Sequence, residues 1–370
     1  MRIGPILRLL PLLLATVAVP AAAQIPASTG WFQVPNTRIR PLCPAGIPGV
    51  IGCEGVTAAW SSGVFDQARN RLIIWGGGHT DYSGNELYAV DLSTLSSSRL
   101  TNPGPPATSC VETLSDGTPN SRHTYAQITF IDHTDEMYSF SGSIACPSSG
   151  INNTTWVFNF TAMRWTRLTP GGTLPPATEG GVTAYDPVGR NVYLHTPSDG
   201  HTYRYDRTAN MYARITTGPD PFPFYGTGVI DPRRRRFVIV GGGQAKSLDI
   251  TLSSTRLSPL SLSGCSGLMS APGPGLAYVP PLDRIVGWAG GNTVYIINLD
   301  TNSCTTQSFT GGPSRVISDT WDNGTFGRWR YSQASQVFVY YGDVDSDAVT
   351  LRISANSGPA PNTPTSVTLR

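Results

Sequence analysis

The sequence is poor in charge, and its basic residues are almost all arginine. Charged residues make up 14% of the 370 residues, the formal net charge is +2, and Lys246 is the single lysine. Four consecutive arginines at 233–236 form the one dense basic run, which we interpret as a solvated hairpin turn. A chain without a basic stripe gives no reason to expect a nucleic-acid partner.

Long apolar runs are absent beyond the first two dozen residues. The start of the chain combines Arg2 and Arg8, the apolar run LLPLLLATVAV and the small residues PAAAQ, which is the layout of a secretory signal peptide. We therefore predict a signal peptide at residues 1–23. No later segment has the 18 apolar residues that a membrane span needs. The short leader and the arginine-rich composition are typical of a bacterial protein, so we expect a secreted or periplasmic location.

The sequence also lacks the cysteine patterns of zinc sites, since it has no CxxC and no Cys-His cluster. An even number of cysteines in an exported chain favours disulfides. Six cysteines allow 15 pairings, and we prefer the three that close local loops: Cys43–Cys53, Cys110–Cys146 and Cys265–Cys304.

What the sequence does contain is glycine (40), proline (31) and an internal repeat. Six segments share an Asp-type turn followed by a strand that ends in glycine: FDQARNRLIIWGGG (65–78), IDHTDEMYSFSGS (131–143), YDPVGRNVYLHTP (185–197), IDPRRRRFVIVGGG (230–243), VPPLDRIVGWAGG (279–291) and YSQASQVFVYYGD (331–343). Ten residues after the turn anchors Asp66, Asp132, Asp186, Asp231, Pro280 and Ser332, five of the six positions are glycine. A period near 50 residues with such strands is the kelch pattern.

On these motifs the chain resembles the bacterial secreted kelch-type β-propellers of the galactose-oxidase-like superfamily. The resemblance implies an all-β fold, with six blades of four strands. The sixth repeat has three clear strands, so we expect GWFQVP (30–35) to supply its fourth strand and close the ring. We predict one propeller domain at residues 24–354, a tail or closing segment at 355–370, and a monomer.

Antiparallel connectivity divides the loops of such a propeller between two ends. The Asp turns lie at one end, here named the Asp-turn face. The loops between second and third strands, and those that lead into the first strands, lie at the other. Four of the five histidines fall in these latter loops, so we name this end the histidine face. It is the predicted ligand site, and its GHTDYSGNE loop (78–86) is the richest in polar side chains.

Histidine, tyrosine and arginine together suit β-elimination from a uronic-acid polymer, as in known propeller-fold polysaccharide lyases. In this leading enzyme hypothesis His79 or His123 is the base, Tyr82 the acid and Arg122 the carboxylate clamp. His195 is a further catalytic candidate. The candidate binding residues on the same face are Asp81, Asn85, Glu86, Glu179, His201, Tyr225, Trp288, Trp321, Arg328 and Tyr341.

Two alternatives remain open. His79, His123 and His195 could instead hold a divalent metal, although no cofactor is required by any motif. Alternatively, the histidine face binds a glycan or another extracellular ligand without chemistry, since propellers host both enzymes and binding modules.

Overall fold

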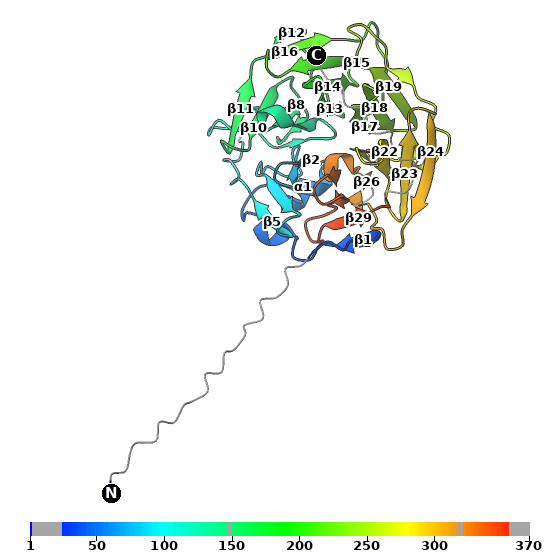
Figure 1. Cartoon of the computed structure of the whole chain (residues 1–370). Coiled ribbons are helices and arrows are strands. Elements are labelled where there is room, and N and C mark those ends of the chain that lie inside the picture. Colours follow the sequence, from blue (N-terminus) through cyan, green and yellow to red (C-terminus); the bar gives the residue numbers. More distant parts are fainter. Residues whose placement is uncertain (2–23, 108, 147–149, 316, 319–320, 355–370) are drawn as a thin grey trace.

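Six four-stranded antiparallel blades surround a common centre in the computed structural model (Figure 1). The structure describes residue 1 and residues 24–107, 109–146, 150–315, 317–318 and 321–354, with the backbone alone at 317–318 and 321–322. The expected all-β propeller of six blades is confirmed. Among the described residues no helix has the length and apolar character needed to cross a membrane.

The first three blades follow one another along the chain, each from its innermost strand outward. Their strands are β2 (Ser62–Asp66), β3 (Arg71–Trp75), β4 (Tyr88–Asp91) and β5 (Ser96–Arg99); β7 (Ile128–Ile131), β8 (Glu136–Phe140), β10 (Thr155–Asn159) and β11 (Arg164–Leu168); and β13 (Val182–Asp186), β14 (Asn191–Thr196), β15 (His201–Asp206) and β16 (Met211–Arg214), with β12 (Gly171–Gly172) added at the edge.

The last three blades repeat this order. Their strands are β17 (Thr227–Asp231), β18 (Arg236–Gly241), β19 (Gln244–Asp249) and β20 (Ser258–Pro259); β21 (Gly275–Val279), β22 (Arg284–Trp288), β23 (Thr293–Asn298) and β24 (Ser303–Ser308); and β27 (Trp329–Ser332), β28 (Val337–Tyr340), β29 (Val349–Arg352) and β1 (Gly30–Gln33).

Short elements lie in the loops between these strands. They are two strand pairs, β6 (Arg122–His123) with β9 (Ser143–Ile144) and β25 (Ile317–Ser318) with β26 (Trp321–Asp322), the helices α1 (Gly55–Ala58) and α2 (Ser266–Ser270), and the 3-10 turns η1 (Arg40–Leu42), η2 (Gly52–Glu54), η3 (Asp132–Thr134) and η4 (Phe326–Arg328).

The N-terminal strand closes the ring, as predicted. β1 pairs antiparallel with β29, with Phe32 opposite Thr350, and Figure 1 shows the blue β1 beside the red β29. Trp31 packs against Trp288 and Trp329, with ring centroids 5.8 and 5.9 Å apart. The two ends of the described chain therefore complete a single blade, in which β1 pairs with the edge of β29.

The turn between first and second strands explains why aspartate recurs at the anchor of the repeat. Asp66, Asp186 and Asp231 each accept backbone N–H groups two or three residues ahead, which is the bond of an Asx turn. In the sixth blade Ser332 does the same through its hydroxyl, which accepts from the Ser335 N–H at 2.9 Å. The repeated aspartate is therefore a feature of the fold.

Two of the four arginines at 233–236 are not merely solvated. Arg234 pairs with Asp283 and Asp300 of the fifth blade, and Arg235 pairs with Asp186 of the third. Their side chains are 14% and 23% exposed. The expected hairpin turn is present between β17 and β18, but the interpretation of the whole run as solvated is wrong, because these two arginines join neighbouring blades.

The three predicted disulfides are all present: Cys43–Cys53, Cys110–Cys146 and Cys265–Cys304. They close loops with sequence separations of 10, 36 and 39 residues. Only Cys304, in β24, lies in a strand of a blade, and the other five cysteines lie in connecting segments. Each disulfide limits the freedom of the unfolded chain.

Candidate functional site

Two of the predicted loops meet on the histidine face. His79 and Asp81 lie in the loop between β3 and β4, and His123 lies in β6, just before the second blade. The Asp81 carboxylate is 2.7 Å from His123 Nε2. The two imidazole rings have centroids 5.9 Å apart. These three residues, from adjacent blades, were all singled out from the sequence.

Two aromatic residues complete the group, which we call the histidine-face cluster: Trp60, His79, Asp81, His123 and Tyr125. The ring centroid of His123 is 5.0 Å from that of Trp60 and 6.1 Å from that of Tyr125. His123 and Tyr125 are buried, whereas Trp60, His79 and Asp81 are partly exposed. A fixed polar pair therefore lies beside a solvent-accessible indole.

Trp60 and Tyr125 were not predicted, although the sequence holds a signal for them. Counted back six or seven positions from each repeat anchor, the chain has Trp60, Tyr125, Gly180, Tyr225, Gly273 and Phe326. Four of these six are aromatic, and all lie in the loops that lead into the innermost strands. Because the repeat was anchored on its aspartates and glycines, this second register was overlooked.

The cluster is built on unusual backbone. Trp60, His79 and Tyr125 have φ values of +47°, +46° and +44°, a region that residues other than glycine seldom occupy. The Tyr125 N–H donates to the Trp60 carbonyl at 2.7 Å, which links the two loops. Such residues persist where the surrounding structure holds them. The same backbone recurs at Gly180, Gly273 and Phe326 in the corresponding loops, so at Trp60 and Tyr125 it is a feature of the repeat.

The His79 loop is fastened to the second blade. The His79 N–H donates to the Ile144 carbonyl, and the Cys146 N–H donates to the His79 carbonyl, both at 3.0 Å. Gly78 has φ +94°, and a Cβ there would lie 2.4 Å from the backbone nitrogen of His123. The glycine thus allows the close approach that brings Asp81 to His123, and the Cys110–Cys146 disulfide secures the same region.

Tyr125 keeps its proton under ordinary conditions. Burial raises the pKa of its phenol, and the nearby carboxylate of Glu179 and the phenol of Tyr225 add to this effect. Its hydroxyl makes no hydrogen bond with the residues that the structure describes. Glu179 and Tyr225, both predicted binding residues, are therefore neighbours of the cluster, and the phenol can serve as a hydrogen-bond donor.

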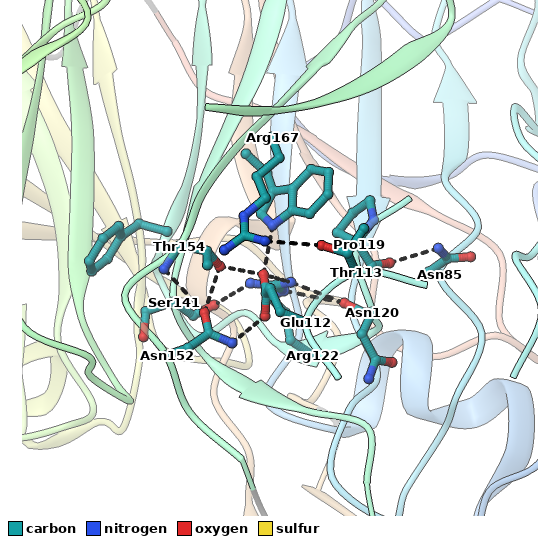
Figure 2. Close-up of polar contacts among 12 residues, drawn as sticks. Asn85, Glu112, Thr113, Pro119, Asn120, Arg122, Ser141, Asn152, Thr154 and Arg167 are labelled. Atoms are coloured by element: carbon teal, nitrogen blue, oxygen red, sulfur yellow. Dashed lines mark hydrogen bonds and ion pairs between the residues drawn. The ribbon is translucent and has the colours of Figure 1, made fainter. Parts of the chain in front are cut away.

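The Arg122 guanidinium is bound by other residues of the protein and is not directed at the cluster. Its guanidinium donates to Glu112 Oε1 at 2.7 Å and to the Asn120 and Ser141 carbonyls. Figure 2 shows Glu112 at the centre of this network, with Asn152 and Thr154 also directed at its carboxylate. Burial alone would raise the pKa of Glu112, but Arg122 and these hydrogen bonds outweigh it and hold the pKa low. Arg122 therefore does not enter the proposal below as a substrate clamp.

Tyr82, Asn85 and Glu86 also serve the fold. Tyr82 is buried, and its hydroxyl donates to Glu86 Oε1 at 2.6 Å. Burial raises the pKa of the Tyr82 phenol, and Glu86 raises it further. Asn85 is buried and bridges the Pro119 carbonyl and the Gly104 N–H. Only the HTD part of the GHTDYSGNE loop faces the cluster.

His195 and His201 lie in the third blade, in β14 and β15, and do not belong to the histidine-face cluster. His195 is fully buried, with Nδ1 3.0 Å from the Thr202 hydroxyl, and burial lowers its pKa to about 4. His201 Nδ1 is 3.0 Å from the Thr216 hydroxyl. Among the described residues no group of three or more His, Cys, Asp or Glu side chains is placed to hold a metal ion. The three-histidine metal hypothesis therefore has no geometric support.

The remaining candidates are largely enclosed in the core. Trp288 is fully buried and its indole donates to the Gly291 carbonyl at 2.9 Å. Tyr341 is fully buried and its hydroxyl accepts from the Ile39 N–H at 2.8 Å. Arg328 donates to four backbone carbonyls, and burial lowers its pKa. The side chain of Trp321 lies outside the described residues.

Comparison with known proteins supports the fold. No family profile matches the chain, and no curated protein matches it in sequence. Two solved structures from Bacteroides thetaiotaomicron VPI-5482 are similar over 88% of this chain and 76% of theirs. One, a structural genomics protein of unknown function, has 9% identity and a TM-score of 0.51. The other, an auxiliary nutrient binding protein, has 12% identity and a TM-score of 0.53. At such identities the likeness is one of fold alone.

Proposed function

We propose that the chain is a secreted, kelch-type binding propeller whose histidine-face cluster holds a saccharide. The observation that carries this proposal is the partly exposed Trp60 indole beside the Asp81–His123 pair. An indole offers a flat apolar surface on which a ligand can pack. The hydrogen-bonded imidazole and carboxylate offer fixed polar groups, as ligand sites require.

Other observations agree with this proposal. The three disulfides suit an oxidising compartment such as the periplasm or the cell exterior. The repeat of about 50 residues suits the kelch type. The similar structure described as an auxiliary nutrient binding protein is consistent with a propeller that captures an extracellular nutrient.

The test replaces Trp60 with glycine and measures oligosaccharide binding by a glycan array followed by calorimetry. Glycine suits the left-handed backbone of this position, since Gly180 and Gly273 occupy the same register with φ +63° and +48°. Trp60→Gly should therefore keep the turn and remove the platform. We expect the Kd to rise at least about tenfold, the value of a lost aromatic contact of about 1.4 kcal/mol.

His201→Ala is the matched control, because His201 lies on the same face but outside the cluster. It should bind as the unaltered protein does, whereas His123→Ala should weaken binding. If a glycan binds equally well to Trp60→Gly and His123→Ala, the cluster is not its site. If no glycan binds to the unaltered protein, the saccharide proposal fails.

A second candidate function is uronate β-elimination, favoured by one observation. Asp81 orients the His123 imidazole as a base is oriented in many active sites, and the protonated Tyr125 phenol lies with its ring centroid 6.1 Å away. His123 would remove the proton α to the carboxylate, and Tyr125 would protonate the departing glycosidic oxygen. A cation to neutralise the uronate is needed as well, and Arg122 is held by Glu112, so binding without chemistry is the better-supported function.

This second candidate is tested by the absorbance of the new carbon–carbon double bond when uronate polymers are supplied. Activity that His123→Ala and Tyr125→Phe both abolish, while Tyr82→Phe retains it, would establish the candidate. Absence of unsaturated product from every uronate polymer would dismiss it.

A further inference from the structure

A cavity of about 440 Å³ lies on the propeller axis at the opposite end from the histidine-face cluster. It is lined by interior residues of the innermost strand of all six blades and by residues of the turns that follow these strands. In the loops at the other end of the innermost strands, the buried rings of Tyr125 and Phe326 pack together with centroids 5.9 Å apart. The volume falls within the range of small-molecule sites.

One basic group lines this cavity. Arg330, the second residue of β27, donates from Nε and one terminal nitrogen to the Gly63 carbonyl, at 3.3 and 3.1 Å. Its other terminal nitrogen makes no hydrogen bond with any described residue, and no carboxylate within the described chain pairs with it. Burial lowers the pKa of Arg330 to about 10, so the guanidinium remains charged near neutral pH.

Arg330 is partly exposed, and no described carboxylate pairs with it. The neighbouring arginines Arg69, Arg234 and Arg235 are each paired with aspartates of the Asp turns. Burying a charge without a partner costs free energy, whereas an apolar replacement is often neutral or stabilising. The hydrogen bonds to the Gly63 carbonyl use only part of the guanidinium, and a ligand that supplies an anion would pair with the rest.

The walls indicate what kind of anion would fit. The lining is of mixed polarity, with Phe65, Phe130 and Ala277 among the buried residues that form its apolar part. The hydroxyls of Thr129 and Tyr331 make no hydrogen bond with described residues and are available to a ligand. Among the described residues of the lining Asp132 is the one acidic residue, and it is solvent-exposed in a turn.

We propose that this axial cavity binds a small organic carboxylate with an apolar body, whose charged group pairs with Arg330. The guanidinium can bind a carboxylate through charge-assisted hydrogen bonds, while the apolar walls enclose the rest of the ligand. This site is independent of the saccharide proposal, because it uses the opposite ends of the innermost strands.

The experiment measures calorimetric binding of acetate, benzoate and 3-phenylpropionate, with inorganic phosphate as an anion that has no apolar body. We expect affinity to rise from acetate to the two aromatic acids. Arg330→Gln should weaken benzoate binding at least about tenfold, the value of a lost charge-assisted hydrogen bond. Asp132→Asn should strengthen it, because the lining then loses its one negative charge. Arg233→Gln, on the same face but 57% exposed, should leave it unchanged.

Thermal unfolding separates this role from a structural one. An Arg330→Gln protein that melts at or above the temperature of the unaltered protein, yet has lost benzoate binding, supports the proposal. If Arg330→Gln lowers Tm by a large amount and Asp132→Asn leaves benzoate binding unchanged, Arg330 serves the fold and the proposal is overturned. The proposal is likewise overturned if no carboxylate binds at millimolar concentration, or if phosphate binds as tightly as benzoate and shows an adventitious anion site.

Discussion

The buried arginines Arg122 and Arg328 hold loops in place by donating hydrogen bonds to backbone carbonyls. Arg122 holds the carbonyls of Asn120 and Ser141, and Arg328 holds those of Ser61, Gly324, Tyr341 and Gly342. A planar group with five N–H donors can satisfy several carbonyls at once, which lysine cannot do. This geometry explains why arginine suits these positions in a protein whose basic residues are almost all arginine.

At this scale we predict that Arg122→Ala lowers the free energy of unfolding by about 3–5 kcal/mol. The reason is that Glu112 would stay buried without its partner cation. Chemical denaturation measures the effect. Arg233→Ala is the control, since its ion pair with Asp283 involves a side chain that is 57% exposed and should cost less than about 1 kcal/mol. Equal losses in the two variants would contradict the argument.

At the scale of elements, the repeated turns have two different tasks. The Asp turns close themselves with side-chain hydrogen bonds and then present arginines to neighbouring blades, as Arg69 does to Asp135 and Arg234 to Asp283. The turns that lead into the innermost strands adopt left-handed backbone at Trp60, Tyr125, Gly180, Gly273 and Phe326. Glycine relieves that strain in two blades, while aromatic residues in three others direct rings toward the axis and the cluster.

The arginine turns predict an acid-dependent loss of stability. Hydrogen bonding to Arg234 lowers the pKa of Asp300, and for Asp283 it outweighs the burial that would raise the pKa. With folded pKa values below the unfolded value near 3.9, the stabilisation is present above about pH 4 and is lost as the pH falls below it.

Arg234→Ala should therefore lower Tm at pH 7, by an amount that corresponds to roughly 1–2 kcal/mol, and the difference from the unaltered protein should shrink by pH 3. Differential scanning calorimetry across this range provides the measurement. Arg236→Ala serves as the control, because the Arg236 side chain is 42% exposed and its ion pair with Asp249 has an N–O distance of 3.8 Å. A difference that stays constant with pH would count against this role for Arg234.

At the scale of the whole molecule, the same six blades provide both the closure of the ring and the two candidate sites. The ring closes where β1 joins β29, and the two candidate sites occupy opposite ends of the innermost strands. Loops supply most of the histidine-face cluster, whereas the innermost strands and the turns that follow them supply the axial cavity. A change in the loops could therefore alter one site without disturbing the other.

Closure leads to a prediction at this scale. Removing residues 24–36 deletes β1, exposes the edge of β29 and uncovers the Trp288–Trp329 stack that Trp31 covers. We expect Tm to fall by at least about 5 °C and the exposed edge to promote association, as shown by calorimetry and size-exclusion chromatography. A synthetic peptide of residues 24–36 should restore both properties, and a scrambled peptide should not. Unchanged melting of the truncated chain would refute closure by β1.

The sequence alone determined the all-β propeller, its six blades, the closing N-terminal strand and the three disulfide pairs. These follow from local patterns: a period, a turn residue, a strand length and the shortest cysteine loops. The sequence also brought His79, Asp81 and His123 to one face, because antiparallel connectivity fixes the end at which each loop lies.

Only the tertiary structure decided which polar residues are available to a ligand. Arg122 and Tyr82 stand next to site residues in the chain, yet Glu112 and Glu86 engage them. Trp60 and Tyr125 reach the cluster through contacts between blades, and Arg330 faces the cavity because six strands converge on the axis. Burial and pairing arise from residues distant in sequence, and a repeat pattern read along one chain contains no information about them.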